Sequence, residues 1–186
     1  MRNIASFLIY ATSVILSLAG VLAAQEELKT VPKVDLNRYV GKWYEIAKYP
    51  NRFEKSCQGN VTAEYALRPD GRIDVKNSCL KKDGKMLIAN GEAKIADKST
   101  NAKLKVRFAP KFLSFLPFVW GDYWVIDLDK DYKYVAIGDK PRAYFWILSR
   151  EPTMDEKTYQ AIVSRVEKLG FKPEKIERTR QNISVS

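Results

Sequence analysis

The chain has 186 residues and contains no histidine. Histidine is the commonest general base at neutral pH and the commonest metal ligand in proteins. Its absence excludes catalytic triads that depend on histidine, zinc sites of the His-Glu-x-x-His type and the usual histidine ligand of haem. The composition therefore argues against these enzymes and against a haem carrier, and we expect no metal and no cofactor.

Cysteine is almost as scarce, since only Cys57 and Cys79 are present. In an exported protein an even pair of cysteines suggests a disulfide. The two residues flank a hairpin turn predicted near Asp70, slightly out of register, so the bond requires a small bulge or a ragged strand start. It would close a loop of about 20 residues, worth about 3 kcal/mol in the chain-entropy model. The alternative is a reactive thiol.

Long apolar runs are missing except at the start, where residues 4–24 follow Arg2 and end in Ala23-Ala24. A basic start, an apolar centre and a small-residue exit are typical of a secretory signal peptide, although the run is also just long enough for a membrane anchor. We expect residues 1–24 to be a signal peptide and residues 25–186 to form one domain. Bacterial lipoprotein signals have a cysteine where this chain has Val21, so we expect a soluble periplasmic or secreted protein without a lipid anchor.

Acidic residues are outnumbered: 32 Lys and Arg against 22 Asp and Glu give a net charge of +10. A basic domain attracts anionic surfaces and anionic ligands. The cations are spread along alternating segments, however, and no basic stripe accompanies a recognition element. We therefore do not expect nucleic-acid binding.

The body of the chain alternates apolar and polar residues in short runs separated by turn residues, which is typical of antiparallel strands. The turns are chemically suited to hairpins, as in Arg68-Pro69-Asp70-Gly71, where Pro sets one φ angle and Gly permits a positive one. Every link except one is short, so consecutive strands pair, and closing eight of them removes the unpaired edges. The expected fold is all-β, an eight-stranded up-and-down antiparallel β-barrel. The expected strands are Trp43–Tyr49, Val61–Leu67, Arg72–Cys79, Met86–Ile95, Ala102–Ala109, Asp122–Asp127, Lys133–Gly138 and Tyr144–Ser149.

One C-terminal helix is expected to pack on the outside of the barrel. It begins at a capping box, Thr153-Met154-Asp155-Glu156, and Gly170 can end it in a left-handed conformation. A short strand, Lys175–Arg178, is expected to return to the barrel edge. The helix places one apolar stripe at 3.6-residue spacing, made of Tyr159, Ile162, Val163, Val166 and Leu169.

Two motifs resemble those of the lipocalin family. The segment 41–45 reads Gly-Lys-Trp-Tyr-Glu, as in the opening Gly-x-Trp motif, and 144–150 reads Tyr-Phe-Trp-Ile-Leu-Ser-Arg, as in the third motif. The second motif departs from the family pattern, because only the turn-forming Asp129 is kept. The resemblance covers Val34 to Gln181 and is strongest to the bacterial lipocalin branch, which is similar to apolipoprotein D.

The lipocalin layout gives three motif residues a structural role. The first strand starts at the closed end of the barrel and the eighth strand finishes there, so Trp43 and Arg150 should meet under the floor. A guanidinium over an indole is a cation–π pair worth about 1 kcal/mol or more when partly buried. We therefore expect Gly41, Trp43 and Arg150 to be structural rather than catalytic.

Period two along the strands, together with the resemblance that places Trp146 inside, predicts which side chains face the lumen. These residues are expected to form the wall of a ligand pocket, although in a small barrel they can equally be plain core. The candidates are Glu45, Ala47, Tyr49, Tyr65, Leu104, Val106, Phe108, Tyr144 and Trp146.

The longest link between strands is unusually apolar for a loop and falls at the predicted open end. Exposed apolar patches usually mark a contact with ligand, membrane or protein. We expect either a lip that touches a lipid surface or a second copy of the chain, or a lid folded over the barrel mouth. The candidate lip residues are Phe112, Leu113, Phe115, Leu116, Phe118 and Trp120.

The resemblance implies a carrier of fatty acids or lysophospholipids and not an enzyme. An apolar lumen suits an acyl chain, and cations near the open end suit a carboxylate or phosphate. Two rival functions remain: a lipid isomerase with a thiol in the lumen, and a protein-interaction or inhibitor module on the same barrel. The candidate cations are Lys55, Lys81, Lys111, Lys140 and Arg142.

Overall fold

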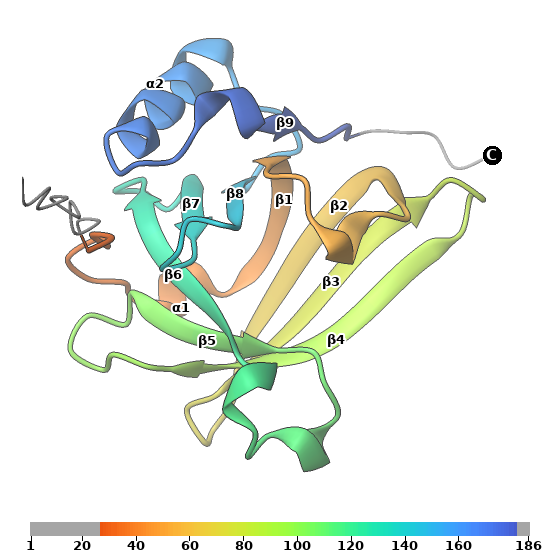
Figure 1. Cartoon of the computed structure of the whole chain (residues 1–186), viewed down its shortest axis with the longest axis vertical. Helices are drawn as coiled ribbons and strands as arrows, with labels where there is room; N and C mark the ends of the chain where they lie inside the picture. Colours follow the sequence, from red (N-terminus) through yellow and green to blue (C-terminus); the bar gives the residue numbers. More distant parts are fainter. Residues whose placement is uncertain (1–26, 182–186) are drawn as a thin grey trace, which may run out of the picture.

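The computed structural model describes residues 27–181, so the predicted signal peptide lies outside the described residues. One antiparallel sheet dominates this part of the chain, with strands in the order β2-β3-β4-β5-β6-β7-β8-β1-β9 (Figure 1). Because β1 also pairs with β2, the first eight strands close into a barrel, and the predicted fold is confirmed. The strands are β1 (Gly41–Lys48), β2 (Cys57–Leu67), β3 (Ile73–Lys81), β4 (Met86–Ile95), β5 (Lys103–Arg107), β6 (Gly121–Leu128), β7 (Tyr134–Gly138), β8 (Phe145–Ser149) and β9 (Glu177–Arg178).

Short helical turns connect the strands, and one longer helix lies outside the barrel (Figure 1). The short helix α1 crosses the closed end, whereas the 3-10 turns η1, η2 and η3 lie in the links β1–β2 and β5–β6. The helical elements are α1 (Leu36–Tyr39), η1 (Arg52–Glu54), η2 (Lys111–Leu113), η3 (Pro117–Val119), α2 (Glu156–Glu167) and η4 (Pro173–Lys175).

The β2–β3 hairpin carries the predicted disulfide. Gly71 in its turn has a φ of 77°, as the turn chemistry requires. β2 begins at Cys57 rather than at Val61, because two register shifts before Thr62 keep it paired with β3. These shifts supply the irregularity that the sequence required, and Cys57 and Cys79 form a disulfide with their Cα atoms 5.7 Å apart.

β5 is shorter than predicted, since it ends at Arg107 rather than at Ala109. Its pairing with β6 stops at Val106, which lies opposite Gly121. Pro110 follows closely and has no amide hydrogen for a ladder. The link from β5 to β6 therefore starts earlier than expected.

The closed end is built around Trp43 and Arg150, as predicted. The Trp43 ring is fully buried, and the Arg150 guanidinium lies 3.7 Å from its centroid. Gly41 has a φ of 97°, and a Cβ there would lie 3.3 Å from the Arg150 guanidinium, so the position favours glycine. The guanidinium also donates hydrogen bonds to the backbone carbonyls of Arg38, Tyr39, Val40 and Lys42.

Helix α2 packs on the outer face of the barrel over a second apolar cluster. The predicted capping box is wrong in its first residue: the N-cap is Asp155, whose carboxylate accepts a hydrogen bond from the Thr158 amide. Asp is as strong an N-cap as Thr, and here it is the residue that directly precedes the helix. Gly170 has a φ of 88°, which confirms the left-handed stop. The buried helix residues are Tyr159, Ile162 and Val166.

Replacing Arg150 with Lys should lower the free energy of unfolding by about 2–3 kcal/mol, because an ammonium cannot reproduce the planar fork over Trp43 or its carbonyl contacts. Arg165→Lys is the matched control. Arg165 pairs with Asp127 at the surface at 2.8 Å, and such pairs are worth about 1 kcal/mol or less. Urea unfolding compares the two, and equal losses would contradict the structural role of Arg150.

Candidate functional site

The barrel interior holds a small apolar cavity at its closed end. Its free volume is about 20 Å³, about the space of one water molecule. Three predicted wall residues, Tyr65, Leu104 and Val106, line it. The remaining lining residues are Leu36, Tyr39, Val40, Ile73, Val75, Ala93 and Tyr123.

The hydroxyl groups of three tyrosines in this half of the barrel form hydrogen bonds with one another. The hydroxyls of Tyr39 and Tyr123 are 2.7 Å apart, and Tyr123 donates to the hydroxyl of Tyr65 at 3.0 Å. Burial raises the pKa of Tyr65 to about 12, so its hydroxyl stays neutral at physiological pH. The closed half of the lumen therefore carries no charge from these residues.

A β-bulge in β1 decides which of its side chains face the lumen. The pairing with β8 shifts between Glu45 and Ala47, so Glu45 lies opposite Leu148 and Lys48 opposite Trp146. Ala47 and Tyr49 were predicted to line the lumen, and this is wrong. Both belong to the outer cluster beneath α2, because the bulge interrupts period two.

The same bulge directs Lys48 into a polar cluster that we define as Glu45, Lys48 and Glu54. The Lys48 ammonium contacts a Glu54 carboxylate oxygen directly and lies 3.6 Å from Glu45 Oε1. Side-chain exposure is only 16% for Lys48 and 3% for Glu45. The cluster is thus a largely buried set of two carboxyl groups around one cation.

Glu54 is held in place from several sides. The Trp146 indole donates to Glu54 Oε1 at 3.1 Å, and the Asn51 amide donates to the same oxygen at 3.2 Å. The ring of Tyr144 stacks on Trp146 at 5.8 Å with an interplanar angle of 9°, and Phe53 packs on Tyr144. The predicted wall residues Tyr144 and Trp146 therefore form an aromatic face beside the polar cluster.

Glu45 has an unusual protonation equilibrium. Burial, and next the negative charge of Glu54, raise the pKa of Glu45 to about 8, although Lys48 and the Thr179 hydroxyl oppose the shift. At neutral pH the Glu45 carboxyl is therefore largely protonated. Lys48 is then balanced mainly by Glu54.

Phe108 lies over Gly91 on the neighbouring strand. A Cβ at Gly91 would lie 2.8 Å from the Phe108 ring and 2.5 Å from the Arg107 carbonyl oxygen, so no other residue fits there without movement. The Phe108 side chain is 42% exposed. It is the most solvent-exposed of the predicted wall residues.

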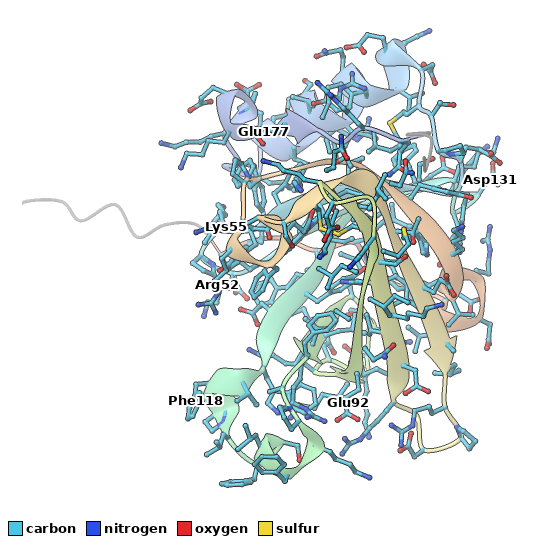
Figure 2. All side chains as sticks on the ribbon, turned by 90° about the vertical axis from the view of Figure 1, so that its right-hand side faces the viewer. Arg52, Lys55, Glu92, Phe118, Asp131 and Glu177 are labelled. Atoms are coloured by element: carbon cyan, nitrogen blue, oxygen red, sulfur yellow. A yellow bond between two sulfur atoms is a disulfide. The ribbon has the colours of Figure 1, made fainter. Side chains whose placement is uncertain are left out.

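Beyond Phe108, the β5–β6 link presents three more phenylalanines, which are more exposed. Phe112, Phe115 and Phe118 are 74%, 78% and 80% exposed, and Leu113 and Leu116 are half-buried. Figure 2 shows Phe118 on a loop that stands away from the barrel, on the same side of the view as Arg52 and Lys55. Such exposure does not fit a lid folded over the mouth. We call Phe112, Phe115 and Phe118 the aromatic lip.

Trp120 was predicted to belong to this lip, and that placement is wrong. It is only 9% exposed, and its indole donates to the Ser114 carbonyl oxygen at 2.8 Å. Lys94 lies 4.2 Å and Arg107 5.2 Å from its ring centroid. Trp120 thus anchors the loop on the outer wall.

Comparison with known proteins identifies the family. A family model described as a lipocalin-like domain matches residues 34–181. The chain belongs to the lipocalin-like family. Temperature-induced lipocalin-1 of Arabidopsis thaliana is 41% identical over 163 residues, which cover 87% of each chain. Outer membrane lipoprotein Blc of Escherichia coli K12 is 39% identical over 142 residues, 76% of each chain.

Further lipocalin relatives support the same fold. Mouse apolipoprotein D is 35% identical over 156 residues, covering 79% of this chain and 77% of the relative. Insecticyanin from the tobacco hornworm matches with a TM-score of 0.64 at 24% identity, over 85% of this chain and 86% of that one. Family membership indicates a binding protein for a small hydrophobic ligand. The motif resemblance found in the sequence is thereby confirmed.

The lipocalin's predicted cations lie in different surroundings. Lys55, Lys111 and Lys140 are exposed, whereas Lys81 pairs with Asp83 at 2.7 Å. Arg142 donates to the Leu169 carbonyl oxygen at 2.6 Å, at the end of α2. They were expected to meet the ligand's carboxylate or phosphate at the open end, whereas the cation beside Glu45 and Glu54 is Lys48, which was not predicted.

Neither Lys48 nor Glu54 could be predicted as a lumen residue, because a bulge has no fixed sequence signature and η1 lies outside the strand pattern. Asp129 behaves as expected, since its carboxylate accepts from the amides of Asp131 and Lys133 in the β6–β7 turn. Within residues 27–181 no helix is long and apolar enough to cross a membrane. The same residues contain no group of three or more His, Cys, Asp or Glu that could hold a metal ion.

The raised pKa of Glu45 predicts a specific pH dependence of stability. In the unfolded chain the carboxyl titrates near pH 4.3. Between that pH and about 8 the native state keeps a proton that the unfolded state has lost, so the free energy of unfolding falls as pH rises through this window. Glu45→Gln cannot ionise, and its loss of stability between pH 5 and pH 8.5 should be smaller than the wild type's by about 2 kcal/mol or more.

Urea unfolding of both proteins at the two pH values measures the difference. Glu64→Gln is the control, because Glu64 is an exposed carboxylate on β2 whose side chain is 44% exposed. An unchanged pH slope in Glu45→Gln would contradict the proposed protonation of Glu45.

Proposed function

We propose that this lipocalin binds a long-chain fatty acid or a lysophospholipid, with the acyl tail toward the closed end and the head at the polar cluster. One observation carries the proposal: the lumen is apolar around the closed-end cavity and ionic around Glu45, Lys48 and Glu54. An amphipathic molecule matches that gradient in one orientation only.

The tail site is the closed-end cavity and the wall above it. Tyr65, Leu104 and Val106 contribute apolar surface there, and Phe108 continues the wall toward the open end. Burying one methylene group contributes about 0.8 kcal/mol, so a long chain gains much from this wall. Since the cavity holds only about 20 Å³, the tail must displace lumen side chains as it enters.

The head site combines the Lys48 ammonium with the protonated carboxyl group of Glu45, which can donate a hydrogen bond. With Glu45 protonated, Lys48 keeps one carboxylate partner, Glu54, and can share its ammonium with a ligand carboxylate or phosphate. The stacked rings of Tyr144 and Trp146 supply a flat surface for the part of the ligand next to the head. Both ligand classes meet these requirements.

Binding rather than catalysis suits the chemistry of the site. Both cysteines are joined in the Cys57–Cys79 disulfide, so neither supplies the thiolate that a thiol-dependent lipid isomerase needs. The rival function as a protein-interaction or inhibitor module predicts that the lumen takes no lipid. Direct binding measurements separate the two.

Narrowing the tail site should block binding. Ala93→Leu adds bulk in the closed-end cavity and should weaken binding of a fluorescent fatty acid to the delipidated protein about tenfold or more. Ala66→Leu, on the exposed outer face of β2, should have no effect. The dissociation constant is measured by fluorescence titration, with lysophospholipid as competitor. Absence of saturable binding to the wild type would overturn this ligand class.

We further propose that the aromatic lip contacts a lipid surface rather than a second copy of the chain. Three exposed phenylalanines on one loop form the kind of apolar patch that enters an interface, and Lys111 on the same loop is exposed as well. The net charge of +10 favours an anionic surface. A lip that touches lipid would place the barrel near its source of ligand.

Replacing Phe112, Phe115 and Phe118 together with Ser should reduce association with anionic vesicles about tenfold or more, as judged by flotation. Leu67→Ser, at an exposed apolar residue at the closed end, is the control and should float as the wild type does. Unchanged flotation together with loss of a dimer in size-exclusion chromatography would instead favour a second copy of the chain.

For location, we propose export without a lipid anchor. The N-terminal segment has the pattern of a signal peptide, and Val21 replaces the cysteine that takes the lipid in lipoprotein signals. The Blc relatives are named outer membrane lipoproteins, so the proposal distinguishes this chain from them.

A further inference from the structure

The wall of the barrel is not continuous between β1 and β2. The two strands pair only where Gly41–Tyr44 lies opposite Thr62–Tyr65. Beyond Tyr44, toward the open end, β1 continues to Lys48 but no longer pairs with β2. The eight strands alone therefore leave a gap in the wall between β1 and β2 toward the open end.

Residues 177–181, which we call the C-terminal strap, fill this gap. On one side Arg178 pairs with Ala47, and the Thr179 amide donates to the Ile46 carbonyl oxygen at 2.9 Å. On the other side the backbone amide of Asn60 on β2 donates to the Arg180 carbonyl oxygen at 2.8 Å. The strap thus takes the place of direct pairing between the strands. In Figure 1, β9 lies beside the end of β1, next to α2.

One side chain of the strap bridges the gap directly. The Gln181 amide donates to the carbonyl oxygen of Glu45 on β1 at 2.8 Å and to that of Val61 on β2 at 2.9 Å. Both acceptors are backbone groups that a continuous sheet would satisfy by strand pairing. Gln181 therefore joins two strand edges that have parted.

The strap also reaches through the gap to the lumen. The Thr179 hydroxyl donates to Glu45 Oε1, and Glu45 Oε1 lies 3.6 Å from the Lys48 ammonium. A group on an outer segment contacts a lumen carboxylate only where the wall is open. The gap between β1 and β2 therefore leads to the polar cluster.

The strap is held by few contacts apart from these. Its strand, β9, has two residues, and most side chains of the strap are exposed. Its outer anchor is Arg178, which pairs with Glu156 and lies 3.2 Å from the Tyr159 ring centroid on α2. Short segments with few buried contacts open at low free-energy cost compared with the barrel strands.

We propose that the C-terminal strap is a removable closure over a side portal between β1 and β2, through which the amphipathic ligand passes with its head beside the polar cluster. The proposal rests on the proposed function for the nature of the ligand, but the portal itself is a property of the wall. Release of the strap opens the lumen at the level of Glu45 and Lys48, without disturbing the floor at Trp43 and Arg150.

Two sets of variants test the closure in opposite directions. Ala47→Cys with Arg178→Cys joins residues that are direct partners in the β1–β9 ladder, a spacing suited to a disulfide. Thr179→Val with Gln181→Ala removes the two strap side chains that reach Glu45. Each single cysteine variant is a control for the first set. Thr153→Val with Asn90→Ala, at exposed residues outside the strap, is the control for the second.

Stopped-flow release of a fluorescent fatty acid is the readout. The cross-linked strap should slow dissociation about tenfold relative to the single variants, and the weakened strap should accelerate it about fivefold. Peptide mapping verifies that Cys57–Cys79 is intact. Unchanged rates in both sets, with binding retained, would overturn the portal and leave the proposed function standing.

Hydrogen exchange tests the closure without any ligand. The amides of Thr179 and Asn60, which bond across the strap, should exchange at least tenfold faster than the amides that join β1 to β2. Equal protection would overturn the portal even if the fatty acid failed to bind. Failure of binding together with fast exchange at the strap would contradict the proposed ligand but support the closure.

Discussion

The bulge in β1 between Glu45 and Ala47 is the local constraint on which the proposed ligand site of this lipocalin depends. One extra residue reverses the direction of the side chains that follow it. It sends Ala47 and Tyr49 under α2 and brings Lys48 into the lumen beside Glu45. Pairing with β2 stops just before the bulge, so the same irregularity coincides with the gap that the C-terminal strap fills.

The two ends of the barrel are stabilised by different interactions. At the closed end, Arg150 lies over Trp43 and binds a row of backbone carbonyls, so a cation is held by aromatic and polar partners without a carboxylate. Toward the open end, Lys48 is held by the Glu54 carboxylate and the largely protonated Glu45 carboxyl group in a largely buried site. Buried charge costs free energy unless it is paired, and here Glu54 provides the pairing. The contrast distinguishes the closed end of the barrel from the end where we propose that the head of the ligand binds.

Much of the fold could be predicted from the sequence, because alternation, turn residues and the Gly-x-Trp motif are local signals. The bounds of β4 follow from alternation and turn residues, the Cys57–Cys79 bond from the even pair of cysteines, and the contact of Arg150 with Trp43 from the resemblance to lipocalins. The site was harder to predict. A bulge is set by pairing with a neighbouring strand, so period two placed Ala47 and Tyr49 on the wrong face and missed Lys48. Trp120 was misplaced because the apolar composition of the whole β5–β6 link suits a lip. Its position directly before β6 instead turns its side chain toward the outer wall.

Paramagnetic broadening in NMR spectra measures directly which way the proposed ligand lies in the barrel. Fatty acids carrying a nitroxide either near the methyl end or near the carboxyl end are bound in turn to isotope-labelled protein. We expect the methyl-end nitroxide to broaden the resonances of Val75 and Leu104, and the carboxyl-end nitroxide to broaden the Trp146 indole resonance. Broadening of Trp146 by the methyl-end nitroxide and of Val75 by the carboxyl-end nitroxide would contradict the proposed orientation.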